Sequence, residues 1–78
     1  MVTDKNGKEL CIGDSVLYVR TTPRFSIRGK IVGFVTIENL LIADVELEFC
    51  NNEPIRNSIV RVRCSELMKY DAERTVFV

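Results

Sequence analysis

Apolar and polar residues alternate along two stretches of the chain, residues 29–37 and 41–49. A period of two is typical of antiparallel strands that bury one face. In the second stretch, the face expected inside carries Leu41, Ala43, Val45, Leu47 and Phe49, and the outer face carries Ile42, Asp44, Glu46 and Glu48. In the first stretch, the inner face carries Gly29, Ile31, Gly33, Val35 and Ile37, and the outer face carries Lys30, Val32, Phe34 and Thr36.

We expect these two strands to form a hairpin. Only residues on the same face can lie opposite each other, so the apolar faces must coincide. A three-residue loop, residues 38–40, achieves this by pairing Ile37 with Leu41, and it places Lys30 opposite Glu48. A two-residue turn would bring Ile31 opposite Glu46 and mix core with surface.

The segments before this hairpin predict turns, one strand and a loop. Asn6-Gly7 and Gly13-Asp14 are turn signals, and residues 15–20 are rich in the apolar residues that favour strands. Residues 21–28 are expected to be a loop, because Pro23 cannot donate a hydrogen bond to a sheet.

After the hairpin, residues 59–64 predict a strand that faces inward through Val60, Val62 and Cys64 and outward through Ile59, Arg61 and Arg63. Antiparallel pairing with the preceding strand places Val60 opposite Val45, which puts Arg61 opposite Asp44. Ser65 is expected to cap a short 3₁₀ turn near residues 65–69 that directs Leu67 to the core. The tail, residues 71–78, ends in β-favouring residues, and either adds a short strand or extends toward a partner.

Length and composition predict one all-β domain over residues 1–78. We expect the barrel over about residues 10–70, flanked by a polar lead and the tail. The chain is 46% apolar, yet none of its apolar runs approaches the length of a membrane span. The polar start MVTDKNGKEL does not resemble a signal peptide. These features favour a soluble, cytoplasmic protein.

The reactive residues argue against catalysis. The chain has three cysteines, Cys11, Cys50 and Cys64, and no histidine. Activation of a serine or cysteine nucleophile by histidine is therefore excluded within the chain. The cysteine spacing does not fit a zinc site, and we interpret all three as free thiols in a reducing compartment. We expect no enzymatic activity, metal or cofactor.

Charge is distributed in blocks although the net charge is zero. Residues 15–37 carry four bases and no acid, residues 38–53 carry five acids and no base, and residues 54–64 carry three bases. The acids at 44, 46 and 48 form either a site for a divalent ion or a solvated face neutralised by Lys30 and Arg61 on the flanking strands. The expected register favours the second interpretation.

The order of these segments resembles SH3-like small barrels of the KOW and Tudor-like type. The resemblance rests on "IGDSVLYV" (12–19), "RGKIVGF" (28–34), "ADVELEF" (43–49) and "VRVRCSEL" (60–67), and covers about residues 10–70. It implies a barrel of four to five antiparallel strands with a 3₁₀ turn before the last strand. It also implies a non-catalytic binding module, often attached to the transcription or translation machinery, with no cofactor.

Two binding surfaces emerge as candidates. The first is the basic-aromatic loop of Arg20, Arg24, Phe25 and Arg28, with Tyr18 nearby, which suits single-stranded nucleic acid or a protein of the nucleic-acid machinery. The alternative is a solvated loop with Phe25 or Ile27 closing the barrel mouth. Arg56, Ile59 and Arg63 form a smaller basic-apolar edge.

The second candidate surface is the apolar set Val32, Phe34 and Ile42. Such a patch, or an exposed sheet edge, suits a protein–protein adaptor or small inhibitor. Alternatively, the C-terminal residues 76–78 fold over it. We expect a monomer or a weak homodimer, with no membrane partner.

Overall fold

The structure, a computed structural model, describes residues 2–70 and is all-β, with strands that pair in an antiparallel sheet. The elements are β1 (Ser15–Thr21), β2 (Arg24–Ile37), β3 (Leu40–Cys50), β4 (Glu53–Pro54), β5 (Ile59–Arg63), a 3₁₀ turn η1 (Cys64–Glu66) and β6 (Met68–Lys69). The strand count exceeds the expected four to five because β4 and β6, of two residues each, add to the four longer strands. Among these residues, none lies in a helix long and apolar enough to cross a membrane.

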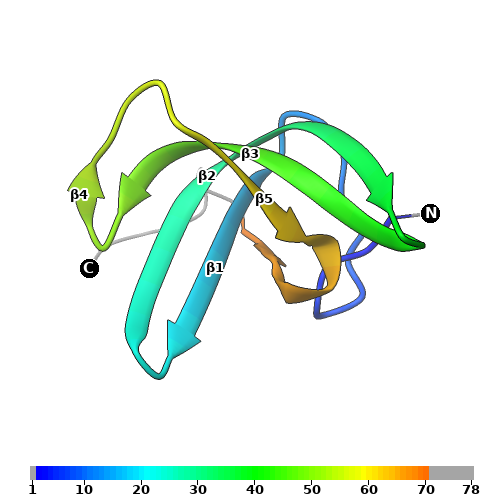
Figure 1. The fold of residues 1–78 in the computed structure, drawn as a ribbon, viewed down its shortest axis with the longest axis horizontal. Coiled ribbons are helices and arrows are strands. Elements are labelled where there is room, and N and C mark those ends of the chain that lie inside the picture. The colour runs from blue at the N-terminus through cyan, green and yellow to red at the C-terminus, as the bar shows by residue number, and fades with distance from the viewer. Residues whose placement is uncertain (1, 71–78) are drawn as a thin grey trace.

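The sheet runs in the order β4-β3-β2-β1-β6, and β5 pairs with β3. The long strands β2 and β3 curve through the molecule, as Figure 1 shows, so that their two halves meet different neighbours. The first half of β2 pairs with β1 as well as β3, and the first half of β3 pairs with β5. This curvature brings the β1–β2 hairpin and β5 to opposite sides of one concave face.

The core lies inside this bend. Its buried apolar residues are Leu10, Val16, Ile27, Ile31, Ala43, Val45, Leu47, Cys64 and Leu67. The inward positions expected for Ala43, Val45, Leu47 and Leu67 are confirmed, but Leu41 and Ile37 are exposed.

The β2–β3 hairpin closes with a two-residue turn, so the expected three-residue loop is wrong. Ile37 lies opposite Leu40, and both turn residues, Glu38 and Asn39, have positive φ, as the type I′ turn requires. A β-bulge resolves the mismatch that a two-residue turn would otherwise cause. Val32 is the extra residue, and it allows Ile31 to lie opposite Val45.

The bulge also changes which residues share a face. Lys30 lies opposite Glu46 rather than Glu48, so the expected Lys30–Glu48 pair is wrong. Beyond the bulge, Phe34 lies opposite the buried Ala43 and packs against the core, although the alternation had placed it outside.

The sequence predicts a loop over residues 21–28, and this prediction is wrong. They form the end of a hairpin in which Arg20 lies opposite Phe25 and Thr21 opposite Arg24. Pro23 occupies the turn between the strands, where no ladder hydrogen bond is needed from it. Residues 22 and 23, between the two strands, are therefore the turn of a tight hairpin and not part of a long loop.

The pairing of β5 with β3 is confirmed in full. Val60 lies opposite Val45 and Arg61 opposite Asp44. The 3₁₀ turn follows directly, but Ser65 lies within it rather than capping it; Arg63 holds the cap position, with no side-chain hydrogen bond. The turn leads into β6, which pairs with β1.

The segment before β1 covers one end of the core and is held by Asp4. The turns at Gly7 and Gly13 occur as expected, with positive φ at both glycines. Asp4 is only 5% exposed and accepts hydrogen bonds from the backbone N–H groups of Asn6, Lys8 and Lys69 at 2.8–2.9 Å. The interpretation of residues 76–78 as a cover for an apolar face falls on the tail, outside the described residues.

Candidate binding groove

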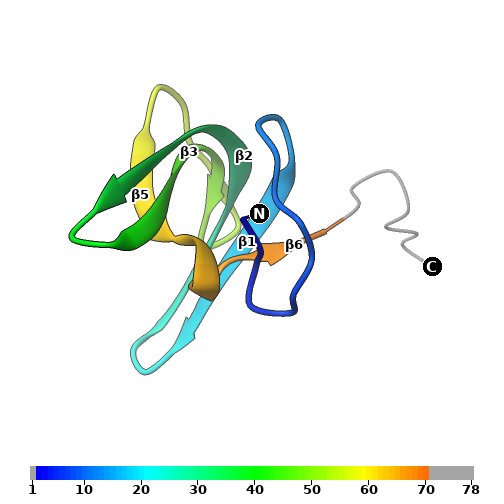
Figure 2. The same ribbon diagram turned by 90° about the vertical axis from the view of Figure 1, so that its right-hand side faces the viewer.

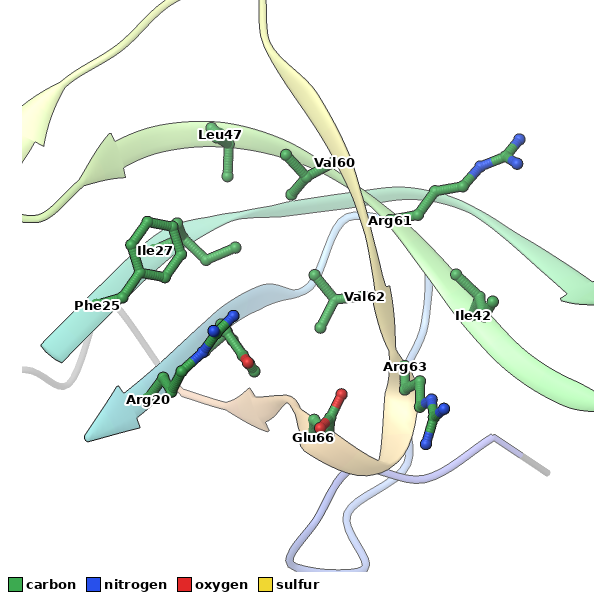
Figure 3. Close-up of a pocket in the computed structure, with 11 residues that line it drawn as sticks. Arg20, Phe25, Ile27, Ile42, Leu47, Val60, Arg61, Val62, Arg63 and Glu66 are labelled. Carbon is green, nitrogen blue, oxygen red and sulfur yellow. The ribbon is translucent and has the colours of Figure 1, made fainter. Parts of the chain in front are cut away.

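An open groove of about 450 Å³ lies between the β1–β2 hairpin on one side and β5 with η1 on the other. We call it the hairpin–β5 groove. Its apolar lining consists of Ile27, Leu47, Val60 and Val62. Figure 3 shows that Val60 and Val62 point from β5 toward the hairpin, whereas Arg61 points away from the groove. The alternation of β5 thus supplies both an apolar wall and a charged outer rim.

Two aromatic rings form the hairpin side of the groove. Tyr18 on β1 and Phe25 on β2 pack edge to face, with ring centroids 6.5 Å apart. Both rings are half-buried, so each keeps an accessible surface. Phe25 is held next to a fixed piece of backbone, because Ser26 and Asn51 exchange hydrogen bonds of 2.8 and 2.9 Å. The rings are therefore positioned before any ligand arrives.

The charged residues of the groove are mostly basic. Arg20 extends from β1 on the same side as Phe25, since the two residues lie opposite each other in the hairpin. Arg61 and Arg63 lie along the β5 side, and Glu66 contributes a carboxylate from η1. Arg61 is bound to Asp44 at 3.0 Å. Arg20 and Arg63 are exposed and take part in none of the ion pairs found among residues 2–70.

The four residues predicted from the sequence as one contact loop lie on two faces of the hairpin. Arg20 and Phe25 face the groove. Arg24 and Arg28 fall on the opposite face by strand alternation. The Arg28 guanidinium lies 4.3 Å from the centre of the Phe49 ring, a cation–π contact, and Arg24 borders a separate hollow beside Asn51.

Arg63 was assigned from the sequence to a separate edge with Arg56 and Ile59. The structure instead places Arg63 at the β5 rim of the groove that Arg20 lines, on the outward face that carries Arg61, while Arg56 borders a different hollow. Tyr18, expected only near the contact loop, is part of the groove wall. Pairing of residue 20 with residue 25 would have indicated that Arg20 and Phe25 share a face. The loop expected over residues 21–28 did not allow for this pairing.

The predicted apolar set does not form one patch. Val32 is exposed at the bulge, Phe34 packs against the core, and Ile42 is half-buried at the end of the groove. The exposed apolar side chains of this hairpin are instead Val32 and, at its tip, Ile37, Leu40 and Leu41.

The acidic residues of β3 were expected to be neutralised by Lys30 and Arg61, and the structure agrees with this in part. Asp44 binds Arg61, and Glu46 lies opposite Lys30. Across residues 2–70, no three His, Cys, Asp or Glu side chains gather closely enough to hold a metal ion. The cysteines differ in environment, since Cys11 is exposed, Cys50 half-buried and Cys64 buried. Burial raises the pKa of the Cys64 thiol.

Comparisons with protein-family models, with curated proteins and with solved structures found no significant match to this chain.

Proposed function

We propose that the protein is a non-catalytic binding module that holds single-stranded nucleic acid in the hairpin–β5 groove. The observation that carries this proposal is the pairing of Arg20 with Phe25 on the groove side of the hairpin. A cation beside an accessible aromatic ring can bind a phosphate while a base stacks on the ring. Arg63, which points outward from β5 as Arg61 does, supplies a second cation at the rim of the groove.

The strand order supports a binding role of this kind. A 3₁₀ turn precedes the last described strand, which is the feature expected from a resemblance to SH3-like barrels of the KOW type. Barrels of this type are often attached to the transcription or translation machinery, and we propose the same role for this chain.

Binding of an oligonucleotide, measured by fluorescence anisotropy against salt concentration, tests the proposal. Two phosphate contacts to a single strand predict a slope of log K against log salt of about −1.4. Arg20→Gln and Arg63→Gln should each reduce the magnitude of this slope by about 0.7. Arg24→Gln is the matched control, because Arg24 lies on the same hairpin but on its other face. Equal losses from Arg20→Gln and Arg24→Gln would contradict the proposed site.

Substitution of Glu66 distinguishes a nucleic-acid ligand from a basic peptide ligand. The Glu66 carboxylate lies in the groove and repels a phosphate chain. Glu66→Gln should therefore tighten binding of an oligonucleotide by about twofold to fivefold. A basic peptide ligand would instead bind the Gln variant more weakly.

A second candidate function, protein–protein adaptor, is favoured by the apolar tip of the β2–β3 hairpin. Ile37, Leu40 and Leu41 are each more than a third exposed. Exposed apolar clusters of this kind mark contact surfaces between proteins. In this case Leu40→Lys would abolish partner binding and leave oligonucleotide binding unchanged.

A further inference from the structure

The second half of β2 presents an open edge. The pairing of β1 with β2 ends at Ser15 and Lys30, and a backbone hydrogen bond from Ile31 to Asp14 closes this ladder. From residue 32 to residue 37, β2 has β3 on one side and, within the described part of the chain, no strand on the other. Figure 2 shows this end of the β2–β3 hairpin projecting away from β1. An open edge offers unpaired backbone donors and acceptors to another strand.

This edge has few of the features by which proteins prevent edge-to-edge pairing. Residues 32–37 read VGFVTI, with no charge and no proline. Val32 and Ile37 at its two ends are 43% and 39% exposed. Edge strands that stay single are commonly guarded by lysine or proline within the strand. The bulge at Val32 is the one protective device, and the five residues after it continue as regular strand.

The charges that flank the edge identify the partner. Lys30 precedes the open segment and Glu38 follows it. Both are exposed, and neither forms an ion pair with another residue among those described. If the segment pairs antiparallel with the same segment of a second copy about a two-fold axis at Phe34, Phe34 lies opposite its own copy and Val32 lies opposite Thr36. Lys30 of each copy then lies opposite Glu38 of the other, whereas an in-register parallel arrangement would bring like charges together.

We propose that the chain forms a two-fold symmetric dimer by antiparallel pairing of the open edge of β2 with the same edge of a second copy, centred on Phe34. The pairing extends the sheet across the dimer and covers Val32 and Ile37. Because the hairpin–β5 groove lies elsewhere in the fold, the dimer does not depend on the proposed nucleic-acid function. It would present two such grooves on one particle.

Sedimentation velocity of the full chain over a range of concentrations tests this dimer. We expect a monomer–dimer equilibrium. Lys30→Glu and Glu38→Lys should each weaken it by about tenfold, since each creates two like-charge contacts. The double variant exchanges the charges and should restore the dissociation constant to within about threefold of the original. Glu48 is also exposed but lies on β3, away from the open edge. Glu48→Lys is therefore the control and should leave the equilibrium unchanged.

Three results would overturn the proposal. They are a monomer at every concentration, a double variant that dimerises no better than the single variants, and a dimer that forms only after residues 71–78 are removed. The last result would assign the edge to the chain's own tail. Thermal unfolding of each variant separates loss of the dimer from loss of the fold. Val32→Lys provides an independent check, because a lysine on the open edge should block pairing without altering the charges at its ends.

Discussion

The Asp4 carboxylate accepts a hydrogen bond from the backbone N–H of Lys69 at 2.8 Å, which joins the start of the chain to its last described strand. Its other oxygen accepts the N–H groups of Asn6 and Lys8. Burial by itself would raise the pKa of Asp4. The backbone donors Lys69, Lys8 and Asn6, with the charge of Lys8, outweigh burial and hold the pKa below its ordinary value.

Asp4→Asn should lower the free energy of unfolding by about 1–3 kcal/mol at pH 7, because an amide cannot accept all three backbone hydrogen bonds. The group's pKa is lowered by folding, so its contribution is complete above the pKa of the unfolded chain. The contribution is lost as pH falls through the lower pKa of the folded state. Urea unfolding should show a constant difference between the two proteins above about pH 5 that shrinks below about pH 3.8. A difference independent of pH would contradict this role, and Glu66→Gln is an exposed control.

Gly29→Ala should destabilise the fold by about 2–4 kcal/mol. A Cβ at this position would overlap the carbonyl oxygen of Glu46 and lie 2.8 Å from Cγ1 of Val45. The backbone oxygen belongs to the paired strand β3 and cannot move aside without breaking the sheet.

Gly33→Ala is the matched comparison for Gly29→Ala. A Cβ on Gly33 would have Asp44 Oδ2 as its nearest neighbour, at 3.9 Å, and Gly33 does not have positive φ. This substitution should be neutral or raise stability by up to about 1 kcal/mol. Equal effects of the two substitutions in urea unfolding would contradict the close approach of β2 and β3 at Gly29.

The turn between β2 and β3 can be improved. Glu38 has φ of 51°, a conformation that asparagine adopts more readily than glutamate. Glu38→Asn should therefore raise the free energy of unfolding by about 0.5–1 kcal/mol. The measurement should be made on dilute protein, where the proposed dimer does not contribute. Loss of stability would indicate that the turn is not of type I′.

The three thiols should react with an aromatic disulfide reagent at different rates. Cys11 is exposed, so it should react as fast as a free peptide thiol. Cys64 is 2% exposed and its pKa is raised, so it should react only when the chain unfolds. Mass spectrometry of the quenched reaction identifies the labelled residue. Labelling of Cys64 before Cys11 would contradict the described packing of η1.

The sequence predicts the fold well where alternation is unbroken. The pairing of β5 with β3 follows from the apolar face of each strand, and Val60 does lie opposite Val45. The sequence predicts the register of the β2–β3 hairpin less well. A bulge shifts this register by one residue, and the residue types of the two strands do not reveal it. Val32 marks that bulge, and nothing in its residue type distinguishes it from a regular strand position.

The candidate site could be predicted only in part. Arg20 and Phe25 are found by the association of basic and aromatic residues, and both line the groove. Arg24 and Arg28 satisfy the same criterion but face away, because the tight hairpin alternates its side chains between two faces. Arg63 joins the site only through the curvature of the sheet, which residue types alone do not specify.

The groove itself is tested most directly by following the backbone amide resonances of the protein while a single-stranded oligonucleotide is added. We expect the largest shifts at Tyr18, Arg20, Phe25 and residues 60–63, with little change at Arg24 and Arg28. Shifts concentrated at Arg24, Arg28 and Asn51, or no shifts at low salt, would contradict the proposal that the hairpin–β5 groove binds nucleic acid.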